Sequence, residues 1–196
     1  MKLSVLDQST AADGVPAAQT LRDTVELAAF AEELGYHRFW VSEHHNHPAI
    51  NGTAPEILMA AISQRTSRIR LGSAGVMLPH YAPLKVAEQF RVLESLAPGR
   101  IDLGLGRAPG GDGLTSMALN PNAHEDANNF PSNVRDLMAW VSGAPLPDGH
   151  HFKNIVAYPV TDTAPEIWML GTSDYGASVA RHDGGSRGFV FLTGLQ

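Results

Sequence analysis

Short apolar runs and segments with helical spacing alternate along most of the chain. The first apolar run covers residues 3–6, and after a polar loop apolar side chains recur at helical intervals over residues 17–34, where Gly35 supplies a stop. This pattern predicts a strand, a loop and a helix, and the same unit then repeats. Further strands are predicted at residues 39–42, 69–77, 101–105, 167–170 and 189–192, and further helices at residues 55–66, 84–96 and 132–141.

The rhythm changes in the second half of the chain. Residues 108–113 are rich in glycine and residues 120–129 are polar, so no regular element is predicted in either stretch. A short extended piece is predicted at residues 155–159. Residues 177–182 predict a short helical link, although the glycines that follow make it a poor helix.

The alternation of strands and helices predicts parallel strands joined by right-handed crossovers. Two arrangements fit, an open doubly wound α/β sheet and a TIM-type (β/α) barrel. A dinucleotide-binding doubly wound sheet would carry a strand–GxGxxG–helix unit near the N-terminus, and this chain does not. The sequence therefore favours the barrel.

The length bears on how much of a barrel is present. A complete barrel has eight βα units in about 250 residues, whereas about six units are counted in these 196 residues. We interpret residues 1–196 as a single barrel domain, incomplete in this chain. It is either truncated or a shortened barrel whose open edge is covered by another subunit or by loops, and the open edge leads us to expect a homodimer.

Composition and charge exclude several classes of partner. With 43% hydrophobic and 17% charged residues the chain is typical of a globular domain with a real core. The formal net charge of -6, from 20 acidic and 14 basic residues, removes the general attraction to phosphate that nucleic-acid binders and polybasic membrane binders use. We therefore expect no nucleic-acid partner.

The absence of cysteine and the N-terminal pattern narrow the chemistry and the location. Without cysteine there is no disulfide, thiolate metal site, iron–sulfur cluster or cysteine nucleophile. The apolar run in MKLSVLDQST is too short for a signal peptide, and no segment approaches the about 20 apolar residues that span a bilayer. We expect a cytoplasmic protein without a membrane partner.

Three histidines and a carboxylate follow the second predicted strand, in the run SEHHNH. Imidazole titrates near neutral pH, so Glu43 and His44 are candidates for acid/base chemistry or for contact with a cofactor. Structural or solvated histidines are an alternative. A metal site is the third alternative. Strand neighbours point to opposite faces, so the remaining ligands would have to come from distant residues, and no metal site is assigned.

Small residues follow the third predicted strand. Ser73, Ala74 and Gly75 would allow a flat ring to lie against the backbone. The alternative is a strand that bends with the curvature of the barrel.

An arginine flanked by glycines follows the fourth predicted strand. The run GLGRAPGGDG lacks the ending of a Walker loop. Arg107 is nevertheless suited to hold a phosphate by charge-assisted hydrogen bonds. The alternative is a salt bridge across the mouth of the barrel.

A second candidate anion site follows the fifth predicted strand. Gly171, Thr172, Ser173 and Tyr175 precede a helical start, where hydroxyls and free amides favour an anion. An ordinary helix N-cap is the alternative.

At these residues the sequence resembles the bacterial luciferase-like flavin monooxygenase family. The matching stretches are LSVLDQS, LGYHRFWVSEHH, TSRIRLGSAGVMLPHYAPLKVAEQF, LAPGRIDLGLGRAPGGD and PEIWMLGTSDYGAS, which run in order to about residue 178. The resemblance implies a (β/α)8 barrel that uses reduced FMN, delivered by a separate flavin reductase, and molecular oxygen. A deazaflavin replaces FMN in one branch of the family.

The resemblance also implies roles for individual residues. His44, preceded by Glu43, matches the active-site histidine near the flavin ring. The 73–75 stretch matches a place where a non-proline cis peptide often supports the isoalloxazine. Arg107 matches a phosphate-binding arginine, and Thr172, Ser173 and Tyr175 match the phosphate loop.

The expected function is a flavin-dependent monooxygenase reaction on a small organic substrate such as an aldehyde. The chain departs from the family beyond residue 178, where ARHDGGSRG is less apolar than the helix expected there, and the last two βα units are missing. Two alternatives therefore stay open, a flavin-binding protein without turnover and an inactive truncated paralogue.

Overall fold

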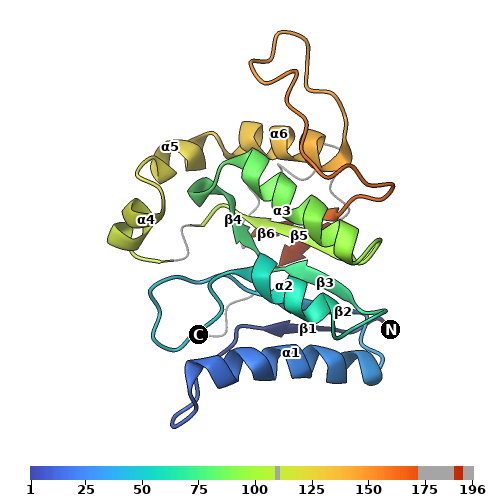
Figure 1. Ribbon diagram of the computed structural model, residues 1–196. Coiled ribbons are helices and arrows are strands. Elements are labelled where there is room, and N and C mark those ends of the chain that lie inside the picture. Colours follow the sequence, from blue (N-terminus) through green and yellow to red (C-terminus); the bar gives the residue numbers. More distant parts are fainter. Residues whose placement is uncertain (109–110, 172–187, 192–196) are drawn as a thin grey trace.

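One parallel sheet organises the molecule. The computed structural model describes residues 1–108, 111–171 and 188–191. Every pairing among the named strands is parallel, in the order β1-β2-β3-β5-β6-β7, with the short β4 pairing with β5 (Figure 1). The strands are β1 (Ser4–Asp7), β2 (Arg38–Val41), β3 (Arg70–Ser73), β4 (Val76–Met77), β5 (Ile101–Gly106), β6 (Glu166–Gly171) and β7 (Gly188–Phe191).

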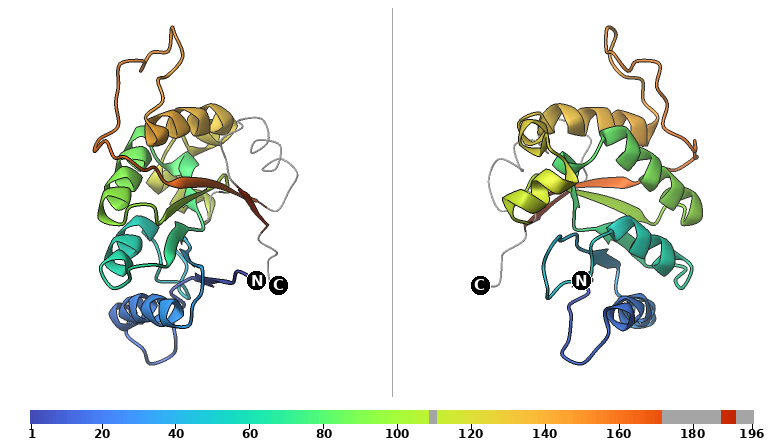
Figure 2. Two further views of the ribbon diagram at one scale, coloured as in Figure 1. Left: turned by 90° about the vertical axis from the view of Figure 1, so that its right-hand side faces the viewer. Right: turned by 60° about the vertical axis from the view of Figure 1, so that its left-hand side comes forward.

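The long helices pack on one face of this sheet. In Figure 2 α1, α2, α3 and α6 lie together on one side of the strands. A doubly wound sheet carries helices on both faces, so the arrangement of the described residues confirms the barrel type. The helices are α1 (Ala17–Glu33), α2 (Pro55–Ser63), α3 (Pro83–Leu96), α4 (Gly113–Leu119), α5 (Ala123–Asn128) and α6 (Phe130–Ser142), with a 3-10 turn, η1 (Leu78–His80).

The core lies between the sheet and these helices. Alternate side chains of each strand point to the helices, and Phe39, Leu71 and Leu103 are almost completely buried there. On the opposite face Trp40 lies over Gly72, where an added Cβ would stand 2.2 Å from its ring. Gly72 is therefore needed for the tryptophan to lie flat on the neighbouring strand. No helix in the described part of the chain is long and apolar enough to cross a membrane.

Most predicted elements are confirmed within three residues at each end, and two differ. The strand predicted at residues 69–77 is divided into β3 and β4 at a cis peptide between Ala74 and Gly75. The extended piece predicted at residues 155–159 is wrong, because no strand forms there. Its backbone is fixed by side chains instead, since Trp140 Nε1 donates to the Ile155 carbonyl and Arg91 Nε to the Pro159 carbonyl.

Two helices were not predicted. Asp112 caps α4, because its carboxylate accepts from the backbone amides of Leu114 and Thr115. Helix α5 lies in the polar stretch, where few apolar residues mark a helical face. The helical link predicted at residues 177–182 lies outside the described residues.

A charged cluster occupies the N-terminal ends of four strands. Asp102 is fully buried and accepts from the guanidinium groups of Arg38, with Nε at 2.9 Å, and Arg70. Glu166 lies 3.3 Å from each of these arginines. Arg38 also lies over the Trp168 ring, 4.8 Å from its centroid. This cluster joins β2, β3, β5 and β6 at one end of the sheet.

Candidate active site

The candidate residues lie at the other end of the sheet. Parallel strands bring their C-terminal ends to one edge, where active sites of barrel proteins are built. The segments that follow β2 and β5 both lie on the left in Figure 1. The structure thus brings together the ends of β2, β3–β4 and β5, as the sequence predicts.

His44 presents an unpartnered nitrogen at this end. Its backbone amide donates to the Gly52 carbonyl at 3.1 Å, which fixes the turn after β2. The ring is half-buried, and Nδ1 is buried with no hydrogen-bond partner among the described residues. Burial lowers the pKa of His44 below its ordinary value, and the neighbouring His47 lowers that pKa further. His44 is therefore a neutral imidazole at neutral pH.

Glu43 does not pair with His44. Its carboxylate is buried and accepts from Tyr81 Oη at 2.6 Å, from His45 Nε2 at 2.8 Å and from the Met77 amide at 3.1 Å. Glu43 and His44 both follow the end of β2, and His44 is not among the three partners of the Glu43 carboxylate. Tyr81 was missed by the sequence analysis, because nothing in its local sequence indicates a contact with Glu43.

The small residues after β3 divide into two roles. Ser73 is fully buried, and its hydroxyl donates to the Gly104 carbonyl and accepts from the Gly104 amide, both at 3.0 Å. This hydroxyl therefore links β3 to β5. Ala74 and Gly75 form the cis peptide, and the Ala74 amide donates to the Val41 carbonyl at 2.7 Å.

Arg107 lies beside a cavity of about 250 Å³ after β5. Its side chain is exposed, as is His124 of α5, whereas His80 of η1 is buried. The two histidines were not singled out from the sequence, because their proximity to Arg107 depends on how η1 and α5 pack. The cavity is lined by Pro79, His80, Arg107, Gly111, Asp112, Gly113, Ser116, Ala123, His124 and Ala127.

The charges around this cavity favour an anion. Asp112 is the only carboxylate among the described residues that line it, and its oxygens accept from α4 amides, from the Thr115 hydroxyl and from Asn46. The hydrogen bond from the Thr115 amide, together with the other bonds, holds the pKa of Asp112 well below its usual range. Arg107 is a permanent cation, so it can bind an anion while the Asp112 oxygens are occupied by these donors.

The predicted anion site after β6 is described only in part. Gly171 ends β6 and is half-buried. Thr172, Ser173 and Tyr175 lie outside the described residues.

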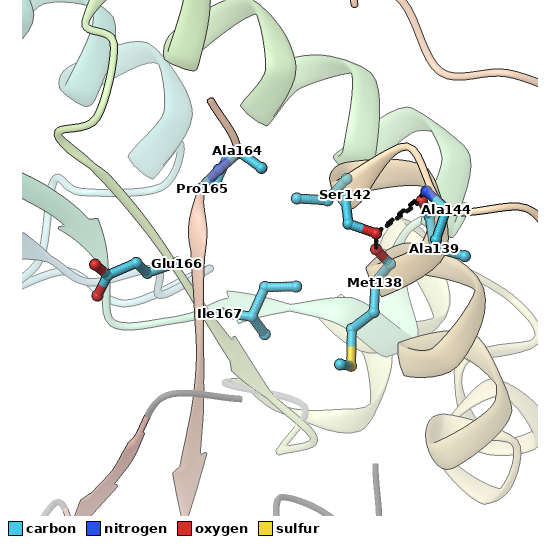
Figure 3. A pocket seen from close by; sticks show the side chains of 9 residues that line it. Met138, Ala139, Ser142, Ala144, Ala164, Pro165, Glu166 and Ile167 are labelled. Carbon is cyan, nitrogen blue, oxygen red and sulfur yellow. Dashed lines mark hydrogen bonds between the residues drawn. The ribbon is translucent and has the colours of Figure 1, made fainter. Parts of the chain in front are cut away.

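A larger cavity, of about 450 Å³, lies between α6 and the start of β6 (Figure 3). Its lining is mainly apolar, and the Ser142 hydroxyl is turned to the carbonyls of Met138 and Ala139. Glu166 lines it at the N-terminal end of β6. This cavity is therefore at the end of the sheet opposite to the candidate site. Among residues 1–108, 111–171 and 188–191, no cluster of three or more potential ligands could hold a metal ion.

Comparison with known proteins identifies relatives over nearly the whole chain. The chain is 47% identical over 191 residues to N-acetyl-S-alkylcysteine monooxygenase of Bacillus subtilis, covering 97% of this chain and 56% of that protein. The crystal structure of apo-MsnO8 superposes with a TM-score of 0.81 at 39% identity, covering 92% of this chain and 52% of that one.

A third neighbour shares the fold. The oxygenating constituent of 3,6-diketocamphane monooxygenase from Pseudomonas putida, solved in complex with FMN, has a TM-score of 0.71 at 23% identity. It covers 88% of this chain and 52% of that one. The chain thus spans about half the length of the relatives it matches.

The family model for luciferase-like monooxygenases matches residues 1–186. That match covers most of the chain and includes the ends of β2, β3–β4 and β5, where the candidate residues lie. The chain belongs to the luciferase-like monooxygenase family.

Proposed function

We propose that the chain forms a flavin site at the C-terminal ends of its strands and serves a monooxygenase reaction with reduced FMN and molecular oxygen. The observation that carries the proposal is the convergence of three features at this edge. They are the unpartnered Nδ1 of His44, the small residues Ala74 and Gly75 directly after β3, and the cavity beside Arg107.

The residues present fit such a cofactor. Buried polar atoms of Ser42 (Oγ) and Asn51 (Nδ2) have no hydrogen-bond partner among the described residues. A buried polar group without a partner costs free energy, and the polar edge of a flavin would supply partners. At Gly75 an added Cβ would lie 2.8 Å from the Gly104 carbonyl oxygen, so the Gly75 backbone packs closely on β5 and would lie under the ring. Arg107 suits a phosphate.

Each residue would have a separate task. Arg107 would hold the phosphate by charge-assisted hydrogen bonds, and Gly171, Thr172, Ser173 and Tyr175 would add a second phosphate contact. The 73–75 segment would support the ring, with Ala74 and Gly75 against it and Ser73 fixing their position through β5. His44 would accept a proton at Nδ1. When bound, the reduced flavin supplies the reaction with oxygen.

Reduced FMN is the cofactor we favour, and the fold neighbour solved in complex with FMN supports that choice. A deazaflavin is the alternative, since another fold neighbour is an F420-dependent alcohol dehydrogenase. We propose a separate flavin reductase as electron source and a homodimer as the assembly. The substrate is a small organic molecule. An aldehyde is one candidate, and an alkyl thioether is another because the chain is similar to N-acetyl-S-alkylcysteine monooxygenase.

Replacing Arg107 by alanine should weaken FMN binding by about 1.5–3 kcal/mol, because a hydrogen bond to a charged group is lost. Titration of the 196-residue chain with oxidised and reduced FMN, followed by quenching of flavin fluorescence, measures the affinity. Arg22→Ala on exposed α1 is the control and should bind as the unchanged chain does. Equal affinity of the Arg107 variant would overturn the phosphate assignment, and an unchanged chain that binds no FMN would overturn the proposed function.

Replacing His44 by alanine should spare FMN binding and lower the rate of substrate-dependent oxygen uptake by about 10²–10⁴-fold, the usual contribution of an acid/base group. Only the neutral ring accepts a proton, so activity should fall as the pH drops through the pKa of His44. Because that pKa is lowered, the midpoint should lie below the ordinary value of about 6.5. His151→Ala, in an exposed loop, is the control. Full activity of the His44 variant would remove its catalytic role.

A further inference from the structure

A buried carboxylate outside the proposed flavin contacts collects donors from three segments. Glu43 is only 2% exposed, yet it is held by the Tyr81 phenol at 2.6 Å, the His45 ring at 2.8 Å and the Met77 amide at 3.1 Å. A buried carboxylate is costly unless such donors surround it. These contacts make Glu43 a junction between β2, β4 and the segment after η1.

Glu43 and its three donors form the Glu43 cluster, in which the Tyr81 phenol is a permanent donor. Burial raises the pKa of Tyr81 far above its ordinary value, and the charge of Glu43 and its hydrogen bond raise that pKa further. Glu56 of α2, which accepts from Gln89 of α3, contributes in the same direction. The hydroxyl therefore stays protonated throughout the pH range in which the protein would work.

The Glu43 cluster helps to fix the backbone of residues 74–77, which would support the flavin ring. Two hydrogen bonds join residues 74–77 to the end of β2 and to the segment after it, which carries His44. One runs from the Ala74 amide to the Val41 carbonyl at 2.7 Å, and the other from the Met77 amide to Glu43. A displaced Glu43 side chain would release the second bond, only two residues beyond Gly75.

We propose that Tyr81 is a positioning residue for the flavin site and acts through Glu43. Its phenol holds the Glu43 carboxylate where that carboxylate fixes residues 74–77. The inference rests on the proposed function, and it replaces the catalytic role expected for Glu43 by a positioning role.

A double-mutant cycle tests the inference. The affinity for FMN is measured for the unchanged chain, Tyr81→Phe, Glu43→Gln and the double variant. Tyr81→Phe removes one hydroxyl and should raise the Kd by about 2–30-fold, the range for mutations that act through a neighbour. In the Glu43→Gln background the same change should have clearly less effect, because the residue through which it acts is already altered.

An alkaline titration of tyrosine absorbance gives a flavin-independent readout. Between pH values of about 8 and 11 the Tyr81 phenol should not ionise, so Tyr81→Phe should leave the amplitude unchanged. Tyr158 is 66% exposed, and the matched control Tyr158→Phe should leave the Kd for FMN unchanged. Far-UV circular dichroism checks folding, and Glu43→Gln tests the same link if Tyr81→Phe does not fold.

Three results would overturn the inference and leave the proposed function standing. If the unchanged chain binds FMN and Tyr81→Phe and Glu43→Gln bind it equally well, the cluster does not position the site. Additive effects in the cycle would show that Tyr81 does not act through Glu43. A loss of amplitude in Tyr81→Phe would show that the phenol is not held. An unchanged chain that binds no FMN is a separate result, and it overturns the proposed function together with the inference.

Discussion

Replacing Asp102 by alanine should lower the free energy of unfolding by about 3–5 kcal/mol, the usual cost of removing one partner from a buried ion pair. Asp102 is fully buried and accepts from two guanidinium groups, those of Arg38 and Arg70. Both arginines are mostly buried, so the variant leaves two cations with Glu166 as their one remaining carboxylate in the cluster. The loss of unfolding free energy should fall near the lower end of this range, because Glu166 still pairs with both arginines.

Urea unfolding followed by circular dichroism measures this effect. Asp148→Ala is the matched control, because the Asp148 side chain is 93% exposed and pairs with Lys153 at the surface. Exposed ion pairs contribute about 0–1 kcal/mol. A loss for Asp102→Ala no larger than that of the control would show that the cluster does not hold the strands together.

Replacing Gly104 by alanine should lower the free energy of unfolding by about 3 kcal/mol, the upper part of the range for overpacking. An added Cβ would lie 2.0 Å from the Ser73 carbonyl oxygen and 2.6 Å from Leu170 Cδ1. The first neighbour is backbone, fixed by the hydrogen bonds between Ser73 and Gly104. Relief therefore requires β3 and β5 to move apart, directly before the 74–75 segment.

The same unfolding measurement checks this expectation. Gly113→Ala is the control, because an added Cβ there meets nothing within 4 Å and alanine favours the helix that begins at this residue. FMN affinity should also fall in the Gly104 variant. A Gly104 variant as stable as the control would show that the strands accommodate the side chain without cost.

The elements were largely predictable because their signals are local. The apolar run before residue 7 and the helical spacing up to Gly35 place β1 and α1 within one residue at all four of their ends. Helix α4 was missed because its clearest signal, the Asp112 cap, stands in a glycine-rich stretch. The break between β3 and β4 was missed because the apolar pattern continues across it.

The candidate site was predictable as a set of positions but not as a set of contacts. Parallel strands with crossovers place His44, Gly75 and Arg107 at one edge, whatever the details of packing. Glu43 was grouped with His44 because the two are adjacent in sequence. The structure turns Glu43 to Tyr81, which is 38 residues away, and no local pattern contains that contact.

The sequence by itself thus determined the strand and helix order, the parallel barrel type and the edge at which chemistry-bearing residues gather. Periodicity and connection length are properties of the chain, so they can be read without coordinates. Only the tertiary structure decided the partners of Glu43, the link between Ser73 and Gly104, and the cavity beside Arg107. Each of these depends on distances between residues far apart in sequence, which are fixed only when the strands and helices pack.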